Sequence, residues 1–186
     1  MTNSPVLDTI RDSFGRVVYT HKTHEKQIEV LGQALTLHKW LQLGSIALTG
    51  AGTLSIIIGQ NRACEVATAV LAAISLALTV YGWSFDPEKA MSQHRQCARQ
   101  LWHIRERYLN LIADLTEKRI TDDVAAGIRD SLVEQLAIIY QSAPDTSSKA
   151  YKKACTALRV SEEMTFSDEE IDAFLPKTLR KVASKQ

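Results

Sequence analysis

The chain has 186 residues, with 22 Lys and Arg against 21 Asp and Glu. A formal net charge of +1 gives no general attraction for nucleic acid, so direct nucleic-acid binding is not expected. The three cysteines, Cys64, Cys97 and Cys155, are odd in number and far apart, which argues against a disulfide framework. With only four prolines, the chain can form long helices.

The first predicted element is a long amphipathic helix within residues 1–39. The residues before it lack the apolar segment of a signal peptide, so a signal peptide is not expected. The three histidines on its seam interrupt the apolar surface and should weaken its packing on a partner helix. The seam residues recur in alternating steps of three and four, as in a heptad: Leu7, Ile10, Phe14, Val17, His21, His24, Ile28, Leu31, Leu35 and His38.

Two stretches without any charged side chain follow, residues 40–61 and 66–85, and only four residues separate them. Roughly 20 uncharged residues in a helix span the ~30 Å hydrocarbon core of a bilayer. Trp40, Tyr81 and Trp83 lie near the ends of these stretches, where aromatic residues contact the membrane interface. The pattern predicts a transmembrane helical hairpin over residues 40–85.

A further helix is predicted within residues 86–118. A hairpin makes the two flanking helices emerge side by side, so this helix should pair antiparallel with residues 1–39 as a cytosolic stalk. The candidates for the seam of that stalk are His21, His24, Leu101, Arg105 and Tyr108. The seam of the second helix again steps by three and four: His94, Ala98, Leu101, Arg105, Tyr108, Ile112 and Leu115.

Residues 119–186 predict three shorter helices. Thr121 begins the first, which ends before Pro144, and a second is expected over 147–159 with Tyr151, Ala154, Cys155 and Leu158 inward. Ser167 and Glu170 have the spacing of a capping box and begin the third. The basic tail from residue 177 is expected to fray. No strand pattern of credible length occurs, so the predicted fold class is an all-α membrane protein, one domain throughout.

Positive charges near the predicted membrane ends indicate the orientation. Lys39 precedes the first span, and Lys89, Arg95 and Arg99 follow the second, whereas the connecting loop has only Arg62. Both termini should therefore be cytoplasmic.

The predicted spans carry small and hydroxyl-bearing residues on one side of each helix. Such faces let helices approach closely and hydrogen-bond within a bilayer. Two interpretations are open: the faces pack the hairpin or an oligomer together, or they line a water-filled path between several copies. The candidates for either role are Ser45, Thr49, Gly52 and Ser55 on the first span and Thr68, Ser75, Thr79 and Gly82 on the second.

The histidines suggest a metal site or a pH-sensitive seam. Counted outward from Lys39 and Asp86, His24 should lie near residue 101, and the pair His21/His24 should lie roughly 10 Å from the pair His94/Cys97. That separation excludes a shared tetrahedral site, although His24 with His103 remains open. Ordinary packing is the alternative, and no metal or cofactor is predicted.

Other chemistry-bearing residues give weak signals. Lys149, Lys152 and Lys153 form a basic patch that is either a solvated helix face or a contact for lipid headgroups or an acidic partner. No nucleophile motif, metalloprotease motif or framed carboxylate pair occurs, so catalysis is not expected.

Three parts of the sequence stand in a fixed order around the two-span hairpin: residues 16–27 (RVVYTHKTHEKQ), residues 94–108 (HRQCARQLWHIRERY), and the tail at 142–144, 148–151 and 162–172. In this pattern the chain resembles the SLATT family of two-transmembrane effector domains. The resemblance implies an antiphage effector that oligomerises and perforates or depolarises the bacterial inner membrane. No catalytic residues carry over.

The same resemblance implies a separate signalling partner, which would be a nucleotide synthase, a nucleotide sensor or a reverse transcriptase. No fused sensor domain is recognisable, so the trigger is expected from another molecule or through residues 119–186. An alternative function is a membrane anchor and scaffold whose cytosolic helices dock a partner enzyme without forming a pore.

Overall fold

The computed structural model describes residues 4–59, 62–84 and 86–180, and every regular element within them is a helix. The predicted all-α class is therefore confirmed for this part of the chain. The predicted span ends at Asn61 and Phe85 and the tail from 181 lie outside the described residues. The helices are α1 (Pro5–Gly59), α2 (Arg62–Ser84), α3 (Pro87–Thr116), α4 (Asp122–Ser142), α5 (Ser148–Arg159) and α6 (Asp168–Phe174), with a 3-10 turn at Lys177–Leu179.

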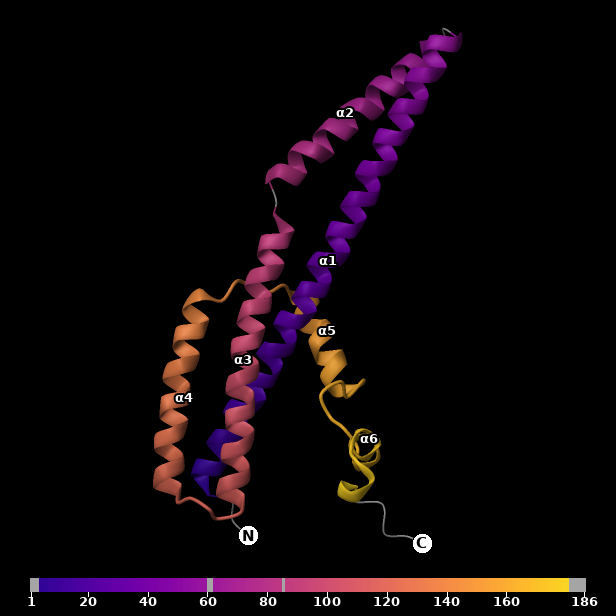
Figure 1. Ribbon diagram of the computed structural model, residues 1–186. Coiled ribbons are helices and arrows are strands. Elements are labelled where there is room, and N and C mark those ends of the chain that lie inside the picture. The colour runs from indigo at the N-terminus through magenta and orange to yellow at the C-terminus, as the bar shows by residue number, and fades with distance from the viewer. Residues whose placement is uncertain (1–3, 60–61, 85, 181–186) are drawn as a thin grey trace.

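Helix α1 is one continuous helix of 55 residues that includes both the amphipathic N-terminal segment and the first uncharged stretch. It does not break at Trp40, where the polar part of the sequence gives way to the apolar part. Backbone hydrogen bonds of a helix form within the segment itself, so the same helix suits water and hydrocarbon. Figure 1 shows α1 running through the full length of the molecule.

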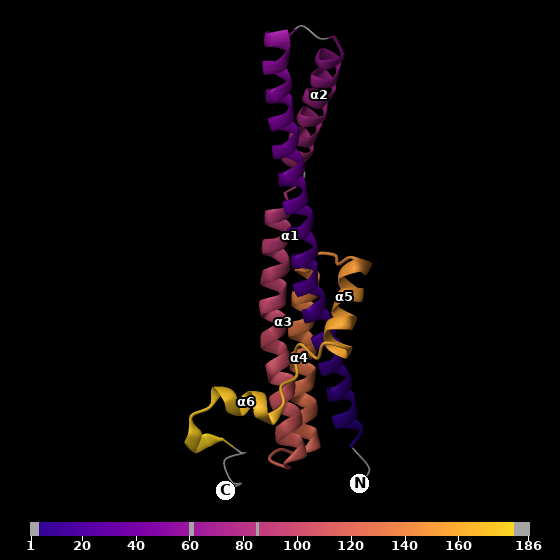
Figure 2. The ribbon, with the colours of Figure 1, turned by 90° about the vertical axis from the view of Figure 1, so that its right-hand side faces the viewer.

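Helices α2 and α3 run back along α1, one beside each half (Figures 1 and 2). We call α1 up to Lys39 together with α3 the stalk, and α1 from Trp40 together with α2 the hairpin. The helix is interrupted between α2 and α3. There the Asp86 carboxylate accepts a hydrogen bond from the Lys89 backbone N–H at 2.9 Å, and Pro87 occupies the first turn.

The hydrophobic core lies in the stalk and continues under α4. The side chains of Ile10 and Val17 from α1 are fully buried, as are Leu101 and Tyr108 from α3 and Leu132 from α4. In the hairpin, by contrast, Ser45 is the one buried residue of α1 beyond Lys39, and α2 has no buried residue. The core therefore stabilises the stalk, and the outer surface of the hairpin stays apolar and uncovered.

The three C-terminal helices begin at the predicted caps. The side chains of Thr121, Ser147 and Ser167 each accept a hydrogen bond from the first turn, and Ser167 forms the full capping box with Glu170. The predicted inner face of α5 is wrong in part, because Tyr151 is exposed. Small side chains let α5 approach α1 closely, and the buried residues of α5 are the alanines Ala150, Ala154 and Ala157.

Candidate functional site

Two helices of the described chain are long and apolar enough to cross a membrane. Their outer surfaces expose large apolar side chains, among them Leu54 at 63% and Ile58 at 86% on α1 and Trp83 at 84% on α2. An uncovered apolar surface of this extent is costly in water and stable in hydrocarbon.

The polar sides of the two spans are turned toward each other. The Gln42 side-chain amide on α1 donates a hydrogen bond to the Thr79 hydroxyl on α2 at 3.2 Å, and Ser45 beside them is buried. Thr49 and Ser75 are half-buried. In this single chain the polar faces therefore contact each other rather than an open path.

The hydroxyl groups on these faces are also satisfied within their own helices. The hydroxyls of Thr49 and Thr79 donate to the carbonyl oxygens of Ser45 and Ser75, in both cases at 2.8 Å. Ser75 donates in the same way to Leu71 at 2.9 Å. Because these three hydroxyl donors do not depend on water, this face can stay closed inside a bilayer.

Two glycines let the spans approach closely. A methyl group added at Gly52 would overlap the Thr68 hydroxyl, and one added at Gly82 would lie 3.0 Å from Nε2 of His38. Such contacts between small residues are a usual basis of helix packing in membranes. Among the candidates on the two faces, Ser55 is exposed and is not brought into this contact.

In the stalk, His24 lies against His94 and Cys97, not against residues 101–103. The Nδ1 atoms of His24 and His94 are 2.9 Å apart, and Nε2 of His24 lies 3.5 Å from the Cys97 sulfur. The expected separation of roughly 10 Å between the His21/His24 and His94/Cys97 pairs was wrong, as was the neighbouring position of His24 with His103.

The hairpin explains this register. Gly52 lies opposite Thr68, Gln42 opposite Thr79 and His38 opposite Gly82, so each step along α1 is matched by one step along α2. The same alignment continued into α3 brings His24 to residues 94–97. The sequence-based register assumed that Lys39 lies opposite Asp86. That assumption shifts α3 by about one helical turn relative to α1.

Burial favours the neutral form of three histidines of the stalk. Burial and the nearby His94 and His21 together lower the pKa of His24 to about 4. Burial also lowers the pKa of His94, and that of His21 despite the attraction of Glu25. Burial raises the pKa of the Cys97 thiol, so this cysteine stays protonated and unreactive at neutral pH.

The other seam candidates differ in their surroundings. Leu101 and Tyr108 are completely buried between α1 and its neighbours. Arg105 lies at the edge of the seam, where its guanidinium pairs with Glu106 and its Nη1 lies 3.6 Å from the Met164 sulfur. Within the described residues no group of three or more His, Cys, Asp and Glu side chains is arranged to hold a metal ion.

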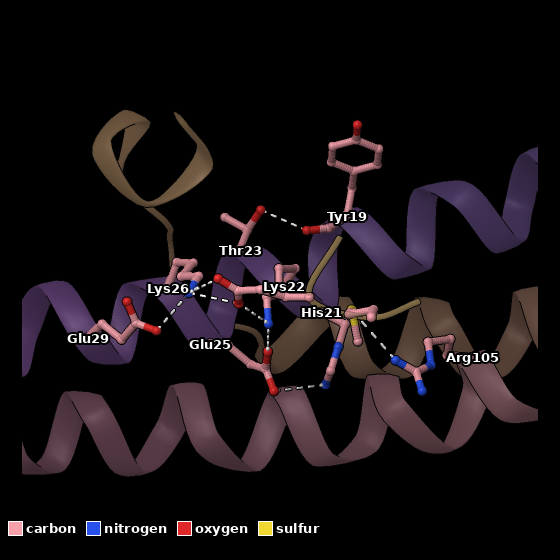
Figure 3. A network of polar contacts seen from close by, with 10 residues as sticks. Tyr19, His21, Lys22, Thr23, Glu25, Lys26, Glu29 and Arg105 are labelled. Atoms are coloured by element: carbon pink, nitrogen blue, oxygen red, sulfur yellow. Dashed lines mark hydrogen bonds and ion pairs between the residues drawn. The ribbon is translucent and has the colours of Figure 1, made fainter. Parts of the chain in front are cut away.

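A cluster of charges on α1 was missed from the sequence. Figure 3 shows Lys22 and Lys26 beside Glu25 and Glu29, close to His21 and Arg105. The lysines also contact Glu163, a residue 137 positions beyond Lys26, in the segment between α5 and α6. The spacing of Lys22 and Lys26 by four residues was the available signal, but it gives no indication of a partner so distant in the sequence.

Comparison with known proteins identifies the family of this chain. Searches of curated proteins and of solved structures found no match. The family model of the SMODS and SLOG-associating 2TM effector domain family 4 matches residues 6–170, which include the hairpin, the stalk and helices α4 and α5. The resemblance to SLATT proteins is thereby confirmed: the chain belongs to this family of two-transmembrane effector domains and is a membrane protein.

Proposed function

We propose that several copies of this chain assemble in the bacterial inner membrane and breach its ion barrier when a separate signal acts on the stalk. The observation that carries the proposal is the pair of membrane-length helices, each with a polar face and an apolar outer face. The family to which the chain belongs is one of effector domains, which supports an active role rather than a passive anchor.

The orientation follows from charge. Lys39 and Lys89 flank the hairpin on the stalk side, and Arg95 and Arg99 follow on α3, whereas Arg62 in the connecting turn is accompanied by Glu65. An excess of Lys and Arg marks the cytoplasmic side of a membrane protein. The stalk, helices α4 to α6 and both termini are therefore cytoplasmic in this proposal.

A single hairpin cannot enclose a pore. In the closed form the polar faces satisfy each other through Gln42 and Thr79 and through their own backbones. In an assembly, each hairpin turns that face toward a common axis, where water replaces the contact between the two helices. Such a path discriminates poorly among ions and dissipates the membrane potential, which would arrest a cell infected by phage.

The signal would come from a partner of the kind that the resemblance implies, such as a nucleotide synthase, a nucleotide sensor or a reverse transcriptase. The continuity of α1 supports this route, because any displacement of the stalk is transmitted to Ser45 and Thr49 through unbroken helix. The proposal assigns no catalytic step to the chain.

A membrane scaffold is the second candidate function. It is favoured by apolar side chains that the stalk side of the molecule leaves exposed, such as Trp102 on α3 and Ile138 on α4. In a scaffold these side chains would dock a partner enzyme, and the polar faces of the hairpin would serve only to pack it.

The deciding experiment measures membrane potential with a voltage-sensitive dye in bacteria induced to high expression of the chain, because a high concentration in the membrane favours assembly even without the separate signal. The wild type should depolarise the cells before viability falls. Thr49→Val and Ser75→Val should abolish depolarisation, because each copy contributes an apolar side chain and the resulting ring excludes water. Valine has nearly the shape of threonine, so hairpin packing at position 49 is kept.

The matched control is Ile58→Val, an equally small change on the exposed side of α1. It should depolarise like the wild type. An unchanged potential at normal membrane abundance of the wild type would favour the scaffold instead. Depolarisation by Thr49→Val as strong as that of the wild type would exclude this face as the ion path.

A further inference from the structure

Two lysines on α1 are unusually well covered for residues of their type. Lys22 and Lys26 are one helical turn apart, and their side chains are only 10% and 12% exposed. Each already has a carboxylate three residues along the same helix, Glu25 for Lys22 and Glu29 for Lys26, both at 2.9 Å. Neither ammonium group therefore depends on another helix for its ion pair.

Glu163 adds a third carboxylate from outside α1. Its Oε2 lies 2.9 Å from Nζ of Lys22 and 3.0 Å from Nζ of Lys26, and its Oε1 lies 3.2 Å from Lys26. One carboxylate thus bridges two ammonium groups. The hydrogen bonds from these two lysines lower the pKa of Glu163, so all three groups are charged at neutral pH.

The segment that carries Glu163 is otherwise held mainly by α5, where the Glu163 backbone N–H donates to the Ala157 carbonyl oxygen at 3.0 Å. The preceding residue, Glu162, has a φ of 47°, in the left-handed region that residues other than glycine rarely adopt. The next residue, Met164, contacts the edge of the stalk through Arg105. Helix α6 beyond it makes no substantial contact with another helix in the described chain. Glu163 supplies the ion pairs between this segment and α1.

An open cavity of about 340 Å³ lies beside the bridging carboxylate. Lys152 and Lys153 of α5 line it together with Lys26 and Glu163, and Glu29, Thr156 and Ser161 are the other polar residues of the lining. Lys153 donates a hydrogen bond to Gln33 at 3.2 Å, and Lys152 is exposed. The basic patch recognised in the sequence is in part the wall of this cavity.

We infer that Lys22, Lys26, Lys152 and Lys153 form a binding site for a small phosphate-bearing solute, and that Glu163 occupies it in this structure. With Glu163 displaced, the four lysines carry two more charges than Glu25 and Glu29 offset, so the site attracts an anion of at least two negative charges. Phosphate oxygens can accept from both Lys22 and Lys26, as the Glu163 carboxylate does now.

The position of the site indicates a dissolved ligand rather than a lipid headgroup. Lys26 precedes Trp40 by fourteen residues of continuous helix, which places it roughly 20 Å from the start of the proposed span. Binding releases Glu163 and with it the segment that leads to α6. This inference goes beyond the proposed function, because binding is measured without any ion conductance.

The test is isothermal titration of the purified full chain with pyrophosphate, in a maltoside detergent and a buffer free of phosphate. Pyrophosphate should bind the wild type, and Glu163→Gln should tighten binding about ten-fold by removing the competing charge. Lys26→Gln and the exposed Lys152→Gln should each weaken binding several-fold. Lys149→Gln is the matched control on the same helix, outside the cavity, and should change binding less than two-fold.

Hydrogen exchange of residues 160–166 gives a second readout. Saturating pyrophosphate should speed exchange in this segment of the wild type to the rate seen in Glu163→Gln. The inference is overturned if neither the wild type nor Glu163→Gln binds, or if Lys26→Gln and Lys152→Gln both bind like the wild type. It is equally overturned if binding disappears in nanodiscs of anionic lipid, since lipid phosphates would then occupy the site.

Discussion

Helix α1 packs in two opposite ways along its length. In the stalk it buries Ile10 and Val17 against α3 and presents charged residues outward. In the hairpin it turns Ser45 and Gly52 toward α2 and presents Leu54 and Ile58 outward. One helix therefore has an apolar inside in its first half and an apolar outside in its second.

The two halves of the molecule are stabilised by different interactions. The stalk is stabilised by removal of apolar side chains from water, at about 25 cal/mol per Å². The hairpin gains nothing in this way inside a bilayer, because lipid tails are as apolar as leucine. Close approach at Gly52 and the hydrogen bond between Gln42 and Thr79 take over that role.

The largest expected effect is the difference between two leucine-to-alanine substitutions, one in the stalk and one in the hairpin. Leu101→Ala in the buried stalk should lower the free energy of unfolding by about 2–5 kcal/mol, because it leaves a cavity. Leu54→Ala on the outside of the hairpin makes the same chemical change and should cost less than about 1 kcal/mol. Denaturant titration in detergent micelles measures both. Equal losses would mean that the hairpin exterior is packed against protein.

The second prediction concerns pH and the stalk alone. His24 has a pKa of about 4 in the folded chain and about 6.5 when unfolded. Between these values the unfolded chain binds a proton that the folded chain does not, so stability is full above pH 6.5 and falls as the pH decreases. From pH 7.5 to 5 the loss should be about 2 kcal/mol.

The histidines around His24 act in the same direction, since burial also lowers the pKa of His94 and of His21. The charged groups near His21 are Glu25 and Glu106, which raise its pKa, and Arg105 and Lys22, which lower it. The variant His24→Gln should therefore flatten the pH dependence of the melting temperature without removing it. A slope identical to that of the wild type would show that His24 is already accessible to protons.

The smallest expected effect concerns the contact between the spans. Gly52→Ala should cost about 1–2 kcal/mol, because the new methyl group overlaps the Thr68 hydroxyl and the helices must shift. Gly50→Ala is the matched control, since an added methyl group there meets no atom within 4 Å, and it should be neutral or slightly stabilising. Resistance of the folded chain to unfolding by SDS measures the effect of both substitutions. An equal response at the two positions would mean that the spans do not pack through Gly52.

Local signals in the sequence were sufficient for most helix boundaries. Uncharged length gave the two apolar helices, and the caps Thr121, Ser147 and Ser167 gave the starts of α4 to α6, because capping depends on residues three positions apart. The inner face of α5 was harder, since the large residues Tyr151 and Leu158 suggested it, whereas close helix approach favours the alanines.

Long-range contacts were beyond the sequence for a different reason. The pairing of His24 with His94 depends on register, and an error of one helical turn at the start of the count moves every partner. Glu163 on Lys22 depends on the path of α4 and α5, which returns the chain to α1 after 140 residues. Neither pairing produces a periodic pattern in the sequence from which it could be predicted.

The unbroken course of α1 has a mechanical consequence. This helix of 55 residues is about 80 Å long, and it has no interruption at which a rotation of one end could be absorbed. If α1 advances past α3 by one residue, the side chain presented at a given point turns by about 100°. Thr49 must follow that torsion, whereas α2 need not, because the non-helical Asp86 precedes α3. A rotation begun among the lysines of the stalk would therefore shear the two polar faces past each other.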